Sequence, residues 1–202
     1  MYSNNPYAQG GWYNPANPNA AGQPGHPQGS YPPTFGALPG SSGTATSVIE
    51  FKFNSFNIDI FNCVVRGPKD VVYFTVSSDT TYPETTTIAK PGGQVIGTVE
   101  WHQHPFVEVR GQVAKQRVSQ WLTMSADSSH RTMTVHGRTY AWVPRGNGIY
   151  LYSTGPTQEQ FARISRGQHS VSLEIASQAI QAGIFEATVV ATLLIQCGRY
   201  ID

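Results

Sequence analysis

The sequence predicts a mostly β domain that follows a disordered N-terminal tail. Three observations lead to this prediction. About ten short segments rich in Val, Ile, Thr, Tyr and Phe are separated by Gly- and Pro-containing turns, a pattern typical of barrels and sandwiches. The segment before the first strand carries no charged side chain. The most continuous apolar segment, residues 184–195, comes near the end of the chain.

Residues 1–46 are the expected tail. Residues 1–45 contain eight prolines, eight glycines and five asparagines, and the first charged residue is Glu50. Proline removes backbone donors and glycine adds backbone entropy, while few apolar side chains offset that entropy, so disorder is expected. Spaced aromatic side chains in this uncharged background indicate weak self-association through the tail: Tyr2, Tyr7, Trp12, Tyr13, Tyr31 and Phe35.

Residues 47–202 are expected to form one domain, which is long enough to bury a core. Turn residues at 67–70, 91–93, 137 and 144–148 predict hairpins between successive strands. On the strand 94–101, Val95, Val99 and Trp101 should share one face, opposite Thr98 and Glu100. The expected strands are residues 48–53, 58–65, 71–76, 85–89, 94–101, 106–110, 131–136, 138–143, 149–152, 161–165 and 171–175.

Residues 184–195 are apolar on almost every side, which predicts a fully buried element. The length of this segment and the following Gly198 favour a helix of about 14 residues. Its β-branched residues leave a buried strand open as the alternative.

Composition restricts the partners and the compartment. A formal net charge of +1 provides no general attraction to nucleic acid or to an anionic membrane, so no nucleic-acid partner is expected. Cys63 and Cys197 lie in apolar runs and are expected to be free thiols. No signal peptide and no membrane-spanning run is recognised, so the expected location is the cytoplasm.

The order of several segments resembles a group of uncharacterised domains common in basidiomycete fungi, which is associated with the tubby-like fold of tubby, LURP-one-related proteins and phospholipid scramblases. The similarity covers roughly residues 48–200. It rests on these elements in sequence: Val71 to Val76, Thr85-Thr86-Thr87-Ile88, Val95 to Trp101, Trp121-Leu122, Arg131, Gly137-x-x-Tyr140-x-Trp142, Phe161-Ala162-Arg163 and Ile184 to Ile195.

The resemblance implies a closed barrel of about 12 antiparallel strands around a buried hydrophobic C-terminal helix. Tubby proteins bind phosphoinositides and scramblases act at membranes, but no matching basic lipid-binding motif is seen in this sequence. Fold-level similarity therefore says little about the function.

His102, His104 and Glu108 are the candidate metal ligands. On a strand the two histidines would point the same way, with Glu100 on that face, and the spacing to Glu108 resembles the first cupin motif. A third histidine is missing after the turn Pro144-Arg145-Gly146, so the ligand set is incomplete. Exposed histidines at the end of a strand are the alternative, and no bound metal or other cofactor is expected.

Arginine and aromatic side chains in the second half are the candidate ligand-binding residues. Arg131 and Arg138 flank one predicted hairpin and could hold a phosphate, although ordinary surface arginines are the alternative. Tyr140 with Trp142, and Tyr150 with Tyr152, share faces that could line a groove or pack across strands. Arg145, Arg163 and Arg166 complete the basic residues considered.

No catalytic motif is recognised. Ser125, Asp127 and His130 share a polar loop, but proximity in sequence does not establish a triad. The leading hypothesis is therefore a non-enzymatic binding or interaction module. A metal-dependent cupin-like enzyme and a peripheral phosphoinositide-binding module remain the alternatives.

Removing residues 1–45 should leave the free energy of unfolding of the domain unchanged within about 0.5 kcal/mol, because a disordered tail makes few lasting contacts. Urea denaturation of the full chain and of residues 46–202 measures the difference. A clear drop in the denaturation midpoint would mean that the tail packs on the domain.

Overall fold

The computed structural model describes residues 47–54, 60–81 and 83–202. The predicted tail, residues 1–46, lies outside these residues. Thirteen strands form one sheet, with a 3-10 turn, η3 (Pro68–Asp70), after β2. The strands are β1 (Val48–Asn54), β2 (Cys63–Arg66), β3 (Val72–Asp79), β4 (Glu84–Ala89), β5 (Val95–Trp101), β6 (Phe106–Val109), β7 (Val113–Arg117), β8 (Leu122–Met124), β9 (Arg131–Val135), β10 (Arg138–Arg145), β11 (Gly148–Ser153), β12 (Gln160–Arg166) and β13 (Val171–Ala176).

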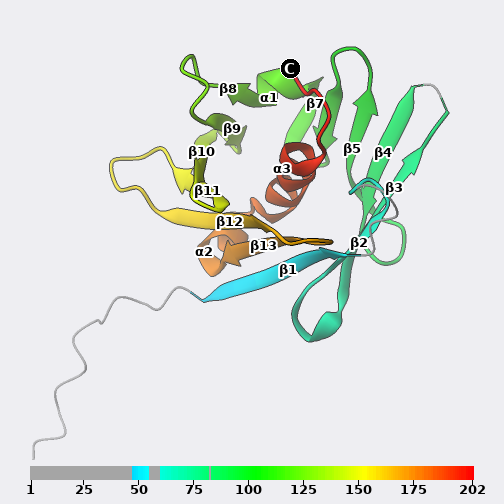
Figure 1. The fold of residues 1–202 in the computed structure, drawn as a ribbon, viewed down its shortest axis with the longest axis horizontal. Coiled ribbons are helices and arrows are strands. Elements are labelled where there is room, and N and C mark those ends of the chain that lie inside the picture. Colours follow the sequence, from blue (N-terminus) through cyan, green and yellow to red (C-terminus); the bar gives the residue numbers. More distant parts are fainter. Residues whose placement is uncertain (1–46, 55–59, 82) are drawn as a thin grey trace, which may run out of the picture. The chain divides into compact units, whose positions relative to one another are not determined.

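The antiparallel sheet curves around a central helix, with β1 and β13 paired in the middle of the strand order. In Figure 1, α3 (Phe185–Gln196) lies between β3–β7 on one side and β8–β12 on the other. Two shorter helices are α1 (Val118–Trp121), which joins β7 to β8, and α2 (Ser177–Gln181), which follows β13. The prediction of a mostly β fold around a buried C-terminal helix is confirmed.

Hydrogen bonds do not close the sheet, which differs from the predicted closed barrel of about 12 strands. β7 and β8 are the two ends of the strand order and do not pair with each other. The two ends of α1, which joins these strands, form hydrogen bonds with other parts of the chain. Val118 N donates to Pro105 O at 2.9 Å, and Trp121 Nε1 donates to Thr134 O on β9 at 3.3 Å. The seam between β7 and β8 is therefore held by the contacts of the helical turn α1 and not by strand pairing.

The predicted hairpins are present. β2 pairs with β3, β4 with β5, β9 with β10, and β10 with β11, all antiparallel. Residues 58–59 of the strand predicted at 58–65 lie outside the described residues. The described part of that prediction was too long, because Ile60–Asn62 form a turn and pairing starts at Cys63. The elements β7, α1, β8 and α2 were not predicted, since they are short and lack a clear period of apolar residues.

The alternation predicted on β5 holds for most of the strand. Val99 and Trp101 are buried while Thr98 and Glu100 are half-exposed. Val95 departs from this pattern because the register with β4 shifts between Ile88 and Ala89, which places Ile96 in the core. Gly97 lets β5 approach α3, since a Cβ at this position would lie 2.9 Å from Val190 Cγ2.

The helix α3 is buried on all sides, so the helical interpretation of residues 184–195 is confirmed and the strand alternative is wrong. Its eight residues from Ala187 to Leu194 are all buried. Thr188 and Thr192 are compatible with this environment because their hydroxyls donate to the carbonyls of Ile184 and Thr188, each at 2.8 Å. Gly198 ends the segment with a φ of +69°, as predicted.

The first turn of α3 is held by side chains of the β4–β5 and β6–β7 connections. Gln112 Oε1 accepts from Ala187 N at 3.1 Å, and Gln112 Nε2 donates to Glu186 Oε2 at 3.0 Å. Lys90 Nζ lies 3.0 Å from Glu186 Oε1. Burial disfavours ionisation of Glu186, but Lys90 and Gln112 outweigh it and lower the pKa of its carboxyl.

Two further predictions concern the whole described region. Cys63 is buried and Cys197 is half-buried, and within the described residues neither forms a disulfide bond, as expected. Within residues 47–54, 60–81 and 83–202, no helix has the length and apolar character needed to cross a membrane.

Leu194→Ala should destabilise the domain by about 2–5 kcal/mol, the range for truncating a buried leucine in a site that cannot collapse. Leu194 is 1% exposed and belongs to the segment Ala187–Leu194, which is buried on every face of α3. Val71→Ala is the matched control, since Val71 is 52% exposed and its truncation should be nearly neutral. Equal unfolding free energies of Leu194→Ala and the parent in urea would contradict this account of α3.

Candidate ligand-binding site

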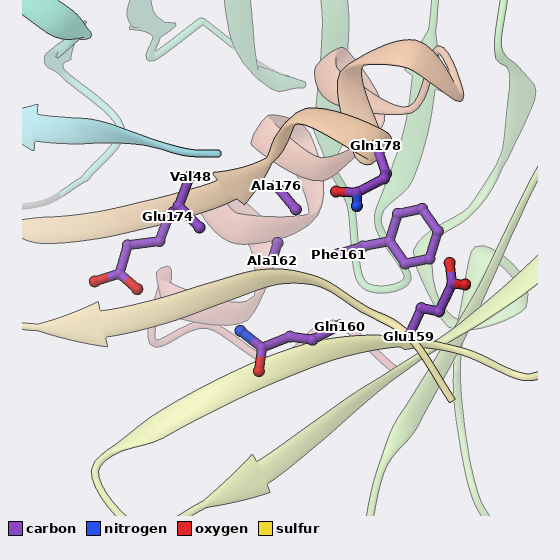
Figure 2. Close-up of a pocket in the computed structure, with 8 residues that line it drawn as sticks. All are labelled: Val48, Glu159, Gln160, Phe161, Ala162, Glu174, Ala176 and Gln178. Atoms are coloured by element: carbon purple, nitrogen blue, oxygen red, sulfur yellow. The ribbon is translucent and has the colours of Figure 1, made fainter. Parts of the chain in front are cut away.

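A groove of about 410 Å³ lies over β12, β13 and the start of α2. Figure 2 shows the methyl groups of Ala162 and Ala176 facing each other in its middle, with Glu174 at one end and Glu159 beside the Phe161 ring at the other. The carboxamides of Gln160 and Gln178 and the side chain of Val48 complete the lining. The groove therefore combines a short apolar floor with carboxylates at both ends.

Strand pairing fixes the Glu174 end. Glu174 is paired with Arg163 on β12 and with Glu50 on β1. Arg163 Nη1 lies 3.5 Å from Glu174 Oε1, longer than the roughly 2.7–2.9 Å of a charge-assisted hydrogen bond. The Arg163 guanidinium also lies over the Tyr150 ring, 5.6 Å from its centroid. Glu174 is thus only loosely neutralised and keeps acceptor capacity for a ligand.

The β11–β12 loop positions Glu159. Ser153 N donates to Glu159 O, and Glu159 N donates to Ser153 Oγ, both at 3.0 Å. The carboxylate of Glu159 forms no ion pair with any residue that the structure describes. Glu159 and Phe161 also line an adjoining hollow of about 380 Å³, which includes Arg138, Tyr140 and the hydroxyls of Ser153 and Thr157.

The four residues predicted to bind a ligand are divided between two hollows. Arg138 and Tyr140 line the hollow beside Glu159, whereas Arg131 and Trp142 line a separate cavity. The register explains this, because Trp142 is paired with Arg131 while Arg138 is paired with Val135 at the other end of the hairpin. Four residues of strand separate Arg138 from Trp142, about 13 Å. The structure therefore does not bring Arg131 and Arg138 together around one phosphate.

Tyr140 and Trp142 share a face as predicted, but that face is the core. They are 3% and 1% exposed, and Tyr140 packs edge-on against Phe161 with ring centroids 5.4 Å apart. Tyr150 and Tyr152 are the accessible pair, stacked 6.2 Å apart on β11. Of the remaining arginines, Arg145 lines a further hollow, and Arg166 is exposed at the end of β12.

The candidate metal ligands are not on one strand. His102 and His104 lie in the bend between β5 and β6, because β5 ends at Trp101 and Pro105 follows. His102 Nε2 faces Glu100 Oε2 at 3.5 Å, and His104 Nδ1 lies 3.2 Å from the main-chain oxygen of Asp202. Glu108 is on β6, paired with Thr98. No group of three His, Cys, Asp or Glu side chains that could hold a metal is found in the described part of the chain.

The loop with Ser125, Asp127 and His130 is ordered by its own hydrogen bonds. Asp127 Oδ1 accepts from Ser125 Oγ at 2.6 Å and from Ser129 Oγ at 2.8 Å, and hydrogen bonds of Ser125 and Ser129 lower the pKa of Asp127 to about 2. Because Ser129 donates its proton to Asp127, it can only accept from His130 Nδ1, 2.9 Å away. This is the reverse of the serine-to-histidine donation of a catalytic triad.

Family comparison applies to most of the domain. The model of a family of unknown function, DUF6593, matches residues 58–199. The chain belongs to the DUF6593 family. A comparison with curated proteins finds no match. An X-ray structure of a protein from Arabidopsis thaliana is similar, with 12% sequence identity over 73% of this chain and 93% of that chain and a TM-score of 0.40, which assigns neither fold nor function.

The segment after α3 ties the two halves of this DUF6593 domain together. Arg199 Nη1 and Nη2 donate to the two carboxylate oxygens of Glu84 on β4, each at 2.8 Å, and its guanidinium lies 4.3 Å from the Phe61 ring centroid. Asp202 Oδ1 and Oδ2 accept from Arg131 Nη1 and Nη2 on β9, at 2.8 and 2.7 Å. Ile201 between them is buried. We call residues 199–202 the C-terminal latch.

The groove residues were missed at the sequence level. Glu174 lies between the buried residues Leu173 and Ile175, so the sequence alternation could have predicted that its side chain points outward. No sequence pattern marked the other polar residues of the groove. Glu159 lies in a loop, Gln160 at the start of a strand and Gln178 in a helix that was not predicted. The pairing of β12 with β13 brings these segments together.

Asp202→Asn should flatten the pH dependence of unfolding in acid. Hydrogen bonds from Arg131 lower the pKa of Asp202 although burial opposes them, so the stabilisation is present above the ordinary aspartate pKa of about 3.9 and is lost as pH falls through the lower folded-state pKa. The slope of unfolding free energy between neutral pH and about pH 3 measures this effect. Glu159→Gln is the control, because the Glu159 side chain is exposed and forms no ion pair with any residue that the structure describes. Identical slopes for the parent and Asp202→Asn would show that the latch does not form.

Proposed function

We propose that this DUF6593 domain is a non-enzymatic binding module, and that the groove over β12 and β13 binds an alkylammonium group. The observation that carries the proposal is the lining of the groove: an alanine floor with a carboxylate at each end and the Phe161 ring beside one of them. Ligand sites are typically concave and apolar with a few convergent polar groups.

The charges of the groove favour a cation. Glu159 has no ion-pair partner among the described residues, and Glu174 has one long contact at 3.5 Å with Arg163. An ammonium group could bind either carboxylate and donate to the carboxamide oxygen of Gln160, while its alkyl chain covers Ala162 and Ala176. A cation near the face of Phe161 gains further attraction from the ring quadrupole.

The other functional hypotheses have less support. The cupin-like enzyme needs His102, His104 and Glu108 to converge, whereas the histidines have different partners, Glu100 and Asp202. The phosphoinositide-binding alternative needs a concentrated basic site. Arg66, Arg131, Arg163 and Arg199 each face a carboxylate instead.

We also propose that the domain has the tubby-like fold. A curved antiparallel sheet around an apolar C-terminal helix supports the tubby-like resemblance. The same architecture supports a domain boundary near residue 47, just before β1. The basidiomycete origin is proposed on the order of the sequence segments alone. A cytoplasmic location and self-association through residues 1–46 are proposed on the sequence alone.

The test is an NMR titration of the domain with N-acetyl-lysine amide and with spermidine, which separate a protein side chain from a free polyamine. N-acetyl-norleucine amide, which lacks the ammonium group, is the neutral control ligand. Saturable shifts should appear at Phe161, Ala162 and Ala176 with the cationic ligands and not with the neutral one. Glu159→Gln and Glu174→Gln should each weaken binding about two- to fivefold, the range of an exposed ion pair.

Glu108→Gln is the matched control, since Glu108 lies on β6 and does not line the groove. It should leave the affinity unchanged. Equal binding of the neutral and cationic ligands, or equal losses with Glu108→Gln and Glu159→Gln, would contradict the proposed role of the groove.

A further inference from the structure

A second, separate cavity lies at the C-terminal end of α3. It has a volume of about 110 Å³ and is lined in part by the loop between β8 and β9. Apolar side chains from four elements form much of its wall: Met124, Trp142, Pro144, Ile149 and Ile195. Arg131 and His130 provide its charged and titratable groups, together with the serines of the loop. None of these residues lines the groove proposed to bind ammonium groups.

Arg131 is held rigidly at this cavity. Its side chain is 15% exposed, and three hydrogen bonds fix the guanidinium. Nη1 donates to Leu122 O at 2.8 Å and to Asp202 Oδ1 at 2.8 Å, while Nη2 donates to Asp202 Oδ2 at 2.7 Å. The rotamer entropy that an arginine usually loses on binding has therefore already been lost.

Two donors of Arg131 remain for a ligand. A guanidinium has five N–H donors, of which these three bonds use both on Nη1 and one on Nη2. The Nε–H and the second Nη2 hydrogen form no bond with any residue that the structure describes. These two donors are adjacent on one edge of the guanidinium, which is the geometry that binds a carboxylate through two parallel bonds.

We propose that the cavity binds a small carboxylate with a short apolar chain. The carboxylate would accept from Nε and Nη2 of Arg131, while the chain would pack against Trp142, Ile149 and Ile195. Asp202 already shows that this arginine holds a carboxylate on its other edge, at 2.7–2.8 Å. The size of the cavity limits the ligand, since an apolar cavity of about 150 Å³ holds benzene, so a chain of about four carbons fits here.

The apolar wall of the cavity and the free edge of the Arg131 guanidinium together form one binding site. Trp142 is 1% exposed and its Nε1 donates to Met133 Sδ at 3.4 Å, so its ring is fixed. His130 Nδ1 donates to Ser129 Oγ at 2.9 Å, which holds the His130 ring in the lining of the cavity. The site is therefore largely pre-formed, and binding requires little reorganisation.

The experiment is an NMR titration of the full chain with butyrate, with butyramide as the neutral ligand of the same length. Saturable shifts of the Trp142 indole N–H and of the Ile149 and Ile195 methyl groups are expected with butyrate. Binding should be at least about tenfold weaker with butyramide, because a neutral amide cannot form the two charge-assisted hydrogen bonds of a carboxylate with Arg131. Equal affinity for the two ligands, or no saturable shift at these residues, would overturn the proposal.

Three variants separate binding from structure. Arg131→Gln should weaken butyrate binding at least about tenfold, whereas Arg145→Gln, an exposed arginine on β10 outside the cavity, should not change it. Asp202→Asn loosens the guanidinium but leaves its charge and its free edge, so it should weaken butyrate binding less than Arg131→Gln does. If Asp202→Asn loses affinity as Arg131→Gln does, the effect comes from the latch and the proposal is wrong.

Discussion

The structure depends on burying a helix that is apolar on every side. An isolated 12-residue helix with this composition would not be stable in water, and α3 gains its stability from the sheet that surrounds it. The helix in turn provides the apolar surface against which both halves of the sheet pack. Gly97 shows how close this packing is, since even a methyl group there would meet Val190.

The C-terminal latch links the two halves of the sheet, which strand hydrogen bonds do not join at β7 and β8. β7 and β8 do not pair, so the two halves of the sheet could separate along that seam. Arg199 bonds to Glu84 in the first half, and Asp202 bonds to Arg131 in the second. Because both residues belong to one short segment that leaves α3, the core helix and the seam are connected. Bidentate geometry makes these ion pairs more specific than ordinary surface pairs.

The two candidate sites have opposite electrostatic character on one scaffold. The groove over β12 and β13 has carboxylates with weak or no pairing, whereas the cavity beside α3 has a rigid arginine with two free donors. Both lie in the second half of the sheet, where the β8–β9 and β11–β12 loops cover the surface. Such loops commonly carry function while the sheet fixes their ends.

The fold class, most hairpins and the burial of most of residues 184–195 could be predicted from the sequence. These features follow from local rules: two-residue alternation, turn residues such as Pro91-Gly92-Gly93, and an apolar segment with no polar face. The sequence also identified Arg131 with Arg138 as a candidate phosphate site and Tyr140 with Trp142 as candidate groove residues. Their division between two separate hollows could not be predicted, because strand register places Arg131 with Trp142 at one end of the hairpin and Arg138 at the other. The pairing of Arg131 with Asp202 joins residues 71 positions apart, a distance at which no local pattern in the sequence constrains the contact.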